Sequence, residues 1–504
     1  MSTGQHTPLG EPIPNKLHAV SVSIPTMSDV IGYEKGIPHI TAKIKTGYPR
    51  FVIHPFLKKI EAYWQNLFAQ PECSIWVTSS AKIARELEAH LADPRTKFLG
   101  HGGVSGLRLP GSDTELNRRA KKFLQHVGGF LSSRNAEDYL FAQNKIDSIE
   151  PEELHLNDPD TKIKSTISPW LGNAPDDSII LTSNGMNAFY ATYQAINAIQ
   201  APKGKRSWIK LGWLYVDTMN IVDKLAPPDS ENIYHYDVFD LDGLEQLIGS
   251  RANDFAGIIT ECPTNPLVHT IDLKRIREIA TKHQIYLVVD PTMNSIANVD
   301  VAPFADVIVN SLTKYAGNQG DIIMGSITAT SQCPEASKFL ELAKSNAEPL
   351  YPRDSQRLAA QIEHYEALVT KANANTQKVV TFLEQQKPVS KIHWSLEERS
   401  RDNYNAIARN QDSAGCMLSF EIDGLLETFF DALPLAKGPS FGLKQSIACP
   451  FIYLAHYDLI STEQGRAYLD KAGINPDLIR LSIGEEEPEQ IIAALQTGFD
   501  ALSV

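Results

Sequence analysis

Two short runs of apolar residues, each followed by polar side chains, mark the middle of the chain. The first, residues 285–289, ends in Asp290, and the second, residues 307–309, leads into a Ser-Leu-Thr-Lys segment that ends at Lys314. A segment with helical periodicity, residues 273–283, precedes the first run. Apolar runs that alternate with helical segments are typical of parallel strands buried on both faces. Because ligands of such sheets bind beyond the carboxyl ends of the strands, we expect Asp290 and Lys314 to face one crevice.

Strand and helix patterns of the same kind extend from residue 166 to residue 345. A strand, a glycine turn and the start of a helix follow one another at residues 178–188, and such a turn directs backbone N–H groups at an anion. The alternation predicts one large α/β domain. Its other strands are expected near residues 207–211, 233–236 and 257–260.

The segments on either side of this domain have different patterns. Residues 1–70 predict a surface arm followed by an amphipathic helix at residues 56–68. Residues 71–165 predict a less regular inserted α/β region. Residues 346–504 predict a smaller C-terminal α+β domain, which opens with a long polar helix at about residues 353–387.

The composition is that of a folded protein with a small-molecule substrate. Of the 504 residues, 42% are hydrophobic and 21% are charged, and the net charge of −13 offers no basic surface for nucleic acid or an anionic membrane. The five cysteines are scattered without a CxxC pair, and no HExxH motif occurs, so we expect no metal site. The first 16 residues lack the pattern of a signal peptide, and no apolar run could span a bilayer, so we expect a cytoplasmic protein.

A lysine and a carboxylate in one crevice are the minimum that pyridoxal phosphate chemistry requires. The amine of Lys314 could bind the cofactor aldehyde covalently, and the carboxylate of Asp290 could keep the pyridine nitrogen protonated. The hydroxyl groups of Ser311 and Thr313 could hold a phosphate. A turn-capping Asp290 and a solvated loop lysine at position 314 are the alternatives.

Eight short motifs support the cofactor assignment. Together they resemble the Cys/Met-metabolism family of pyridoxal phosphate enzymes, and within it the cystathionine γ-synthases of a longer, fungal-like branch. The resemblance implies fold type I, the aspartate aminotransferase type, with a large, mainly parallel sheet of seven strands and a smaller C-terminal α+β domain. In chain order, the motifs are Tyr48-Pro-Arg50, Ser183-Asn-Gly185-Met186, Tyr215-Val-Asp-Thr218, Glu261-Cys-Pro-Thr-Asn265, Val289-Asp290-Pro-Thr292, Ser311-Leu-Thr313-Lys314, Lys437-Gly-Pro-Ser440-Phe-Gly442 and Arg480-Leu-Ser482-Ile-Gly-Glu485.

The resemblance also implies a role for each matching residue. Lys314 would carry the cofactor and move protons, Asp290 would pair with the pyridine nitrogen, and Tyr215 would stack on the ring as the third catalytic residue. Arg480 would clamp the substrate carboxylate, with Ser440 on the substrate side. A partner subunit would supply two of the cofactor contacts, which implies a homodimer or homotetramer with shared active sites. The remaining cofactor-binding residues would be Gly185, Met186, Asn265, Thr292, Ser311 and Thr313, with Tyr48 and Arg50 from the partner.

The resemblance implies γ-replacement on an activated homoserine. An O-succinyl, O-acetyl or O-phospho ester would leave from Cγ, and cysteine would add to give cystathionine, a transsulfuration step of methionine biosynthesis. A cystathionine-type γ- or β-lyase would use the same catalytic residues, and a non-catalytic scaffold of the same fold is a further alternative. The family's Tyr-Gly-Gly-Thr motif is Tyr-Val-Asp-Thr here, and its Ser-Leu-Gly-Gly motif is Ser-Phe-Gly-Leu at position 440, so the substrate stays open.

Overall fold

A computed structural model describes residues 7–48, 52–251 and 253–503 of the protein. Its largest sheet has seven strands in the order β6-β12-β11-β10-β9-β7-β8. Neighbouring strands pair in parallel except β12, which is antiparallel to both of its neighbours, so the expected mainly parallel sheet is confirmed. The strands are β6 (Ile179–Thr182), β7 (Ser207–Leu211), β8 (Ile233–His235), β9 (Phe255–Glu261), β10 (Tyr286–Asp290), β11 (Val307–Ser311) and β12 (Gly325–Ala329).

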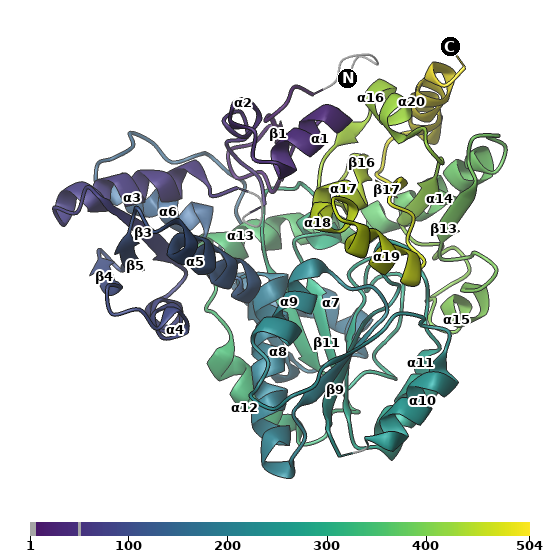
Figure 1. The fold of residues 1–504 in the computed structure, drawn as a ribbon, viewed down its shortest axis with the longest axis horizontal. Helices are drawn as coiled ribbons and strands as arrows, with labels where there is room; N and C mark the ends of the chain where they lie inside the picture. Colours follow the sequence, from purple (N-terminus) through teal and green to yellow (C-terminus); the bar gives the residue numbers. More distant parts are fainter. Residues whose placement is uncertain (1–6, 49–51, 252, 504) are drawn as a thin grey trace.

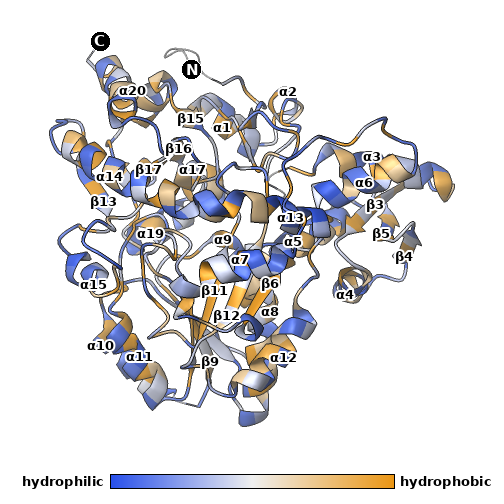
Figure 2. Cartoon of the chain, turned by 180° about the vertical axis from the view of Figure 1, so that it is seen from behind, coloured by the Kyte–Doolittle hydropathy of each residue, from blue (hydrophilic) through white to orange (hydrophobic). Residues whose placement is uncertain are grey.

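Helices cover both faces of this sheet because successive side chains of a strand point to opposite sides. On β10, Tyr286 and Val288 join one hydrophobic cluster, while Leu287 and Val289 join the other. The apolar strands β11 and β12 lie between the two helical layers (Figure 2). One layer contains α8 (Gly185–Gln200), α9 (Val216–Lys224) and α12 (Ala336–Asn346), and the other contains α7 (Pro159–Ile167), α10 (Leu241–Ser250) and α11 (Leu273–Lys282).

The N-terminal arm lies beside the C-terminal part of the chain, whereas the region after the arm forms a projection on one side of the large sheet (Figure 1). A three-stranded antiparallel sheet, in the order β3-β5-β4, packs there against α3 and α4. The elements are β1 (Pro12–Ile13), β2 (Ser21–Val22), α1 (Met27–Glu34), α2 (Pro38–Thr41), α3 (Pro55–Leu67), β3 (Cys73–Thr78), α4 (Ala81–Leu91), β4 (Lys97–His101), β5 (Val104–Pro110), α5 (Thr114–Val127) and α6 (Ser133–Ala142).

The C-terminal part has a five-stranded sheet in the order β13-β14-β17-β16-β15. Together with the helices around it, this sheet forms the smaller α+β unit that was expected after the large sheet. The elements are β13 (Lys391–Trp394), α15 (Arg401–Asn405), β14 (Met417–Glu421), α16 (Leu426–Ala432), β15 (Ala436–Lys437), β16 (Ile447–Pro450), α17 (Phe451–Ala455), α18 (Tyr457–Ile460), α19 (Glu463–Lys471), β17 (Leu478–Ser482) and α20 (Pro488–Ala501).

The long helix expected at residues 353–387 is interrupted. It is divided into α13 (Pro352–Gln361), a 3₁₀ turn η5 (Ile362–His364) and α14 (Tyr365–Leu383). The side chain of Asn318 donates a hydrogen bond of 3.0 Å to the carbonyl of Gln361, and Ile362 is buried in the core. Tertiary contacts therefore override the local helical preference at this point. Every helix in the described part of the chain is too short or too polar to cross a lipid bilayer.

Candidate active site

A cavity of about 90 Å³ lies beyond the carboxyl ends of β9, β10 and β11. The large sheet supplies its floor, and residues from the C-terminal sheet and from the N-terminal arm close it. The cavity brings together most of the residues that the sequence indicated. These are Tyr48, Gly185, Met186, Tyr215, Asn265, Asp290, Thr292, Ser311, Lys314, Ser440 and Arg480.

Lys314 lies three residues after the end of β11 and is the N-cap residue of the 3₁₀ turn η4 (Tyr315–Gly317). Its Nζ atom lies 3.4 Å from the hydroxyl of Ser440, 4.7 Å from the centre of the Phe441 ring and 5.0 Å from that of Tyr48. Burial and, to a smaller extent, the nearby guanidinium of Arg480 together lower the pKa of Lys314 to about 7. A large share of this amine is therefore neutral and nucleophilic near neutral pH.

Asp290 ends β10 and lies beside Glu261, its register partner on β9. Burial raises the pKa of Asp290 to about 6, although the backbone N–H of Thr292 donates a hydrogen bond of 2.9 Å to its Oδ1. Burial and the charge of Asp290 raise the pKa of Glu261 well above its ordinary value. The two adjacent buried carboxyl groups repel each other when both are ionised, so a protonated pyridine nitrogen beside them would be stabilised.

The N-terminus of α8 points at the cavity next to β11. A Cβ atom on Gly185 would lie 3.0 Å from the Cβ of Ser311, so only glycine lets the helix approach the strand this closely. The buried hydroxyl of Ser311 has no hydrogen-bond partner among the described residues. An unpaired hydroxyl and the positive end of a 16-residue helix suit a phosphate group.

Arg480 reaches the cavity from β17 in the C-terminal sheet and is buried. Its guanidinium donates hydrogen bonds of 3.2 Å to Oδ1 of Asn265 and 3.0 Å to the carbonyl of Pro439, and it lies between the rings of Phe441 and Phe451. Burial lowers its pKa from the ordinary value. Among the described residues, its hydrogen bonds go to the neutral oxygens of Asn265, Pro439 and Ser440, so the guanidinium keeps a positive charge that an incoming carboxylate can pair with.

Thr313 and Tyr48 each make a contact that the sequence did not indicate. The hydroxyl of Thr313 donates to the carbonyl of Met324 at 3.2 Å and accepts from its N–H at 3.1 Å, so this side chain points away from the cavity. Tyr48 lies beside Lys314 within the single chain, and the contribution of this residue by a partner subunit stays a prediction. Arg50 lies outside the described residues.

Backbone hydrogen bonds hold the arm that leads to Tyr48 against the rest of the chain. The N–H of Val20 donates to the carbonyl of Gly320 at 2.8 Å, and the N–H of Ile24 donates to the carbonyl of Lys437 at 3.1 Å.

The sequence analysis did not identify Phe451, which forms part of the cavity wall. Its only local signal is an apolar run at residues 447–454, which buried structural segments share.

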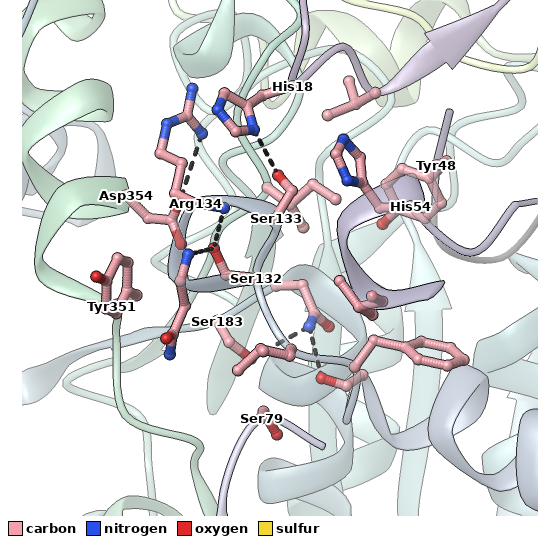
Figure 3. A pocket seen from close by; sticks show the side chains of 18 of the residues that line it. His18, Tyr48, His54, Ser79, Ser132, Ser133, Arg134, Ser183, Tyr351 and Asp354 are labelled. Atoms are coloured by element: carbon pink, nitrogen blue, oxygen red, sulfur yellow. Dashed lines mark hydrogen bonds and ion pairs between the residues drawn. The ribbon is translucent and has the colours of Figure 1, made fainter. Parts of the chain in front are cut away.

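A second cavity, of about 180 Å³, adjoins the first and shares Tyr48 and Met186 with it. The arm, the inserted region and α13 surround it (Figure 3), and Arg134 bonds Asp354 there at 3.2 Å. Asp217, at a glycine position of the family motif, accepts hydrogen bonds of 2.8 Å from Gln125 and lies 2.9 Å from His126 Nδ1. This departure from the family motif thus anchors the inserted region beside α9.

Residues 173–500 match the family of Cys/Met metabolism PLP-dependent enzymes. The chain belongs to this family. It is 35% identical to the L-2-amino-4-chloropent-4-enoate dechlorinase/desaturase of Streptantibioticus cattleyicolor, with 97% of each chain covered. It is 26% identical to the cystathionine gamma-synthase of Neurospora crassa, with 96% of each chain covered, which agrees with the expected fungal-like branch.

Solved structures of the family share the fold. The cystathionine gamma-lyase of Lactobacillus plantarum matches with a TM-score of 0.58 at 22% identity, over 69% of this chain and 87% of that one. The cystathionine gamma synthase of Xanthomonas oryzae pv. oryzae matches with a TM-score of 0.57 at 23% identity, over 67% of this chain and 84% of that one. These similarities confirm fold type I.

The cofactor of this enzyme is therefore pyridoxal 5′-phosphate, and the cavity suits it. Lys314 offers the amine for covalent attachment, and Asp290 offers the carboxylate for the ring nitrogen. The N-terminus of α8 and the hydroxyl of Ser311, which is unpaired within the described part of the chain, offer the phosphate site. Tyr215, the N-cap residue of α9, lines the same cavity.

Cofactor uptake should depend on pH because only the neutral amine of Lys314 attacks an aldehyde. With a pKa of about 7, the uptake rate of the cofactor-free protein should rise roughly tenfold per pH unit below pH 7 and then level off. Stopped-flow absorbance after mixing with pyridoxal phosphate, from pH 5.5 to 10, measures this rate. A rate that still rises tenfold per unit above pH 8 would indicate an ordinary lysine and contradict the prediction.

Proposed function

We propose that the enzyme acts at Cγ of a 2-amino acid and replaces a small, neutral γ-substituent with a thiol. O-Acetylhomoserine with cysteine, giving cystathionine, is the preferred pair. The proposal rests on one observation: the amine of Lys314 and the guanidinium of Arg480 lie in the same cavity. Homodimers or homotetramers remain our proposal for the assembly.

Arg480 binds and orients the substrate in this scheme. Its guanidinium holds the α-carboxylate, which brings Cα and Cβ toward the amine of Lys314. The amine accepts the proton from Cα and gives it up again, and the neutral amine then accepts the proton from Cβ while the γ-substituent leaves with its bonding electron pair. The thiol loses its proton to the departing substituent and adds at Cγ, and protons return to Cβ and Cα. When bound, the cofactor accepts the electron pair released at Cα. The rings of Phe441 and Phe451 exclude water from this side of the cavity.

The cavity wall favours a neutral γ-substituent. The described charged residues that line it are Glu261, Asp290, Lys314 and Arg480, and each of them already has a role toward the cofactor or the α-carboxylate. Apart from the hydroxyl of Ser440, the rest of the substrate side is apolar, so the described part of the wall offers no second cation for a succinyl carboxylate or a phosphate. An acetyl ester or a halide therefore fits better. The apolar residues on this side are Phe441, Cys449, Phe451, Leu454 and Ala455.

Loss of a γ-substituent without replacement is a second candidate. It is favoured by the same apolar wall, which offers little to hold the charged amino and carboxylate groups of a cysteine. The 35% identical relative is named as a dechlorinase/desaturase, and a chloride is a small γ-substituent of the kind that the wall admits. The catalytic roles of Lys314 and Arg480 would be the same for this reaction.

Product analysis tests both candidates. Purified enzyme is incubated with O-acetyl-, O-succinyl- and O-phosphohomoserine, each with and without cysteine, and separately with cystathionine and with 2-amino-4-chloropent-4-enoate. We expect cystathionine from the acetyl ester at least about tenfold faster than from either charged ester, since an unpaired buried charge costs more than 1.4 kcal/mol. Release of chloride from 2-amino-4-chloropent-4-enoate, with no cystathionine formed from any of the esters, would support elimination. A 2-oxo acid formed from cystathionine alone would show a lyase and refute both.

A further inference from the structure

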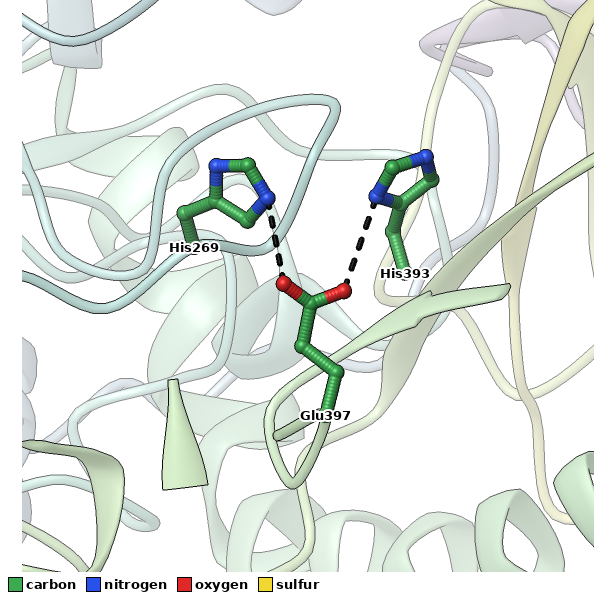
Figure 4. Close-up of side chains that lie close together, drawn as sticks. All are labelled: His269, His393 and Glu397. Atoms are coloured by element: carbon green, nitrogen blue, oxygen red, sulfur yellow. Dashed lines mark ion pairs between the residues drawn. The ribbon is translucent and has the colours of Figure 1, made fainter. Parts of the chain in front are cut away.

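Two histidines and a glutamate converge between the large sheet and the C-terminal sheet. His269 lies on the loop after β9, His393 lies on β13, and Glu397 follows four residues later in the turn after β13. Both imidazole rings point at the one carboxylate (Figure 4). His269 Nε2 lies 3.1 Å from Oε1 of Glu397, and His393 Nδ1 lies 3.6 Å from Oε2. The three groups could thus face a common centre.

These distances match those expected around a small metal ion. Zinc binds imidazole nitrogen and carboxylate oxygen at about 2.0–2.2 Å in a tetrahedral arrangement, which places neighbouring ligand atoms roughly 3.3–3.6 Å apart. The ligand atoms of His269, His393 and Glu397 all lie within 4.8 Å of one another. Small side-chain rotations would bring them to bonding distance. Two histidines and one glutamate are also a common zinc ligand set, with water in the fourth position.

The surroundings of His393 support the same conclusion. Its Nε2 lies 2.6 Å from Oε1 of Glu421, whose Oε2 accepts a hydrogen bond of 3.0 Å from Asn475. A metal-binding histidine usually donates its second ring N–H to a carboxylate in this way, which leaves the other nitrogen free to bind the metal. That other nitrogen, Nδ1, is buried and has no hydrogen-bond partner among the described residues. Nδ1 points at Glu397. Without a cation between them, the lone pair of the neutral imidazole would face a carboxylate oxygen.

The site has an entry path and an acceptable charge. A cavity of about 240 Å³ is lined by His269 and by the exposed side chains of Lys391 and Arg399. Arg399 pairs with Asp237 at 3.5 Å, and water screens the exposed ammonium of Lys391. The carboxylates of Glu397 and Glu421 lie closer and can offset a divalent cation.

We propose that His269, His393 and Glu397 bind one divalent transition-metal ion of the zinc type, with Glu421 orienting His393. The ion ties the loop of the cofactor domain to the C-terminal sheet. This loop also carries Asn265, which bonds Arg480, and it closes on itself through Thr264 and His269, whose backbone groups bond at 2.9 Å. The ion would therefore support the position of the substrate-binding arginine from a distance.

Metal titration of the enzyme with its cofactor bound tests the proposal. The protein is dialysed against a chelator and titrated with Zn²⁺ in competition with a chromophoric chelator, and Co²⁺ is added separately to read the visible absorption of a tetrahedral site. We expect one ion per chain. Glu397→Gln and His393→Asn should each weaken binding at least about a hundredfold, and Glu421→Gln about 10–100-fold. His39→Asn, at an exposed histidine of α2, is the matched control and should bind like wild type.

The outcomes distinguish a metal site at His269, His393 and Glu397 from a hydrogen-bonded cluster of the same residues that binds no ion. They also distinguish it from metal binding by cysteines elsewhere in the chain. Wild-type protein that binds no ion would overturn the proposal, because a proton shared by His393 and the two carboxylates would then account for the geometry. Binding that Glu397→Gln and His393→Asn leave unchanged would also overturn it. The isosteric Glu397→Gln variant, with its cofactor absorbance and circular dichroism compared with wild type, gives the answer even where His393→Asn does not fold. None of these readouts depends on the proposed reaction.

Discussion

Replacing Lys314 with alanine is expected to lower turnover by at least about a thousandfold. The substitution removes the amine that attaches the cofactor and accepts the protons of Cα and Cβ, and no second lysine lines the cavity among the described residues. Borohydride reduction followed by peptide mass analysis should show the cofactor on the peptide that contains residue 314 in the wild type and no covalent cofactor in the variant. Steady-state turnover with the best substrate measures the loss.

Lys344→Ala, which removes an exposed lysine of α12, is the matched control for this experiment. It should keep both the covalent cofactor and the turnover. The variant at position 314 should remain folded, because its side chain lies in a cavity and makes one long hydrogen bond, to Ser440 at 3.4 Å. Full turnover in Lys314→Ala, or attachment of the cofactor at another lysine, would contradict our assignment of the active site.

Arg480→Lys is expected to lower kcat/KM about 100- to 1,000-fold while the cofactor stays bound. A lysine keeps the positive charge but loses the two parallel N–H groups that match a carboxylate, and charge-assisted hydrogen bonds contribute about 1.5–3 kcal/mol each. The loss should appear largely in KM for the amino acid substrate. Steady-state kinetics and the absorbance of the bound cofactor measure the two effects separately.

The control for this variant is Arg206→Lys, at an exposed arginine before β7. It should leave both kinetic constants within about twofold of wild type. If Arg480→Lys retained wild-type KM, or lost the cofactor together with its activity, Arg480 would not be the group that binds the substrate carboxylate. The next candidates for that role would then be the other polar groups of the cavity wall.

The sequence alone determined the strands that carry the cofactor site. The runs before Asp290 and Lys314 are apolar at successive positions, which indicates strands buried on both faces, and the carboxyl ends of such strands meet at one edge of a parallel sheet. The glycine turn at Gly185 likewise predicted the anion-binding end of a helix. These features depend on a few neighbouring residues, so local periodicity and residue type are sufficient to locate them.

The tertiary structure alone decided which distant groups meet. Arg480 bonds Asn265 across 215 positions of sequence, and His269 meets Glu397 from a different sheet. Thr313 turned away from the cavity because its hydroxyl bonds Met324, and the helix predicted at residues 353–387 is interrupted where Asn318 bonds Gln361. Such contacts depend on the packing of segments far apart in the chain, and no local pattern of polar and apolar residues records that packing.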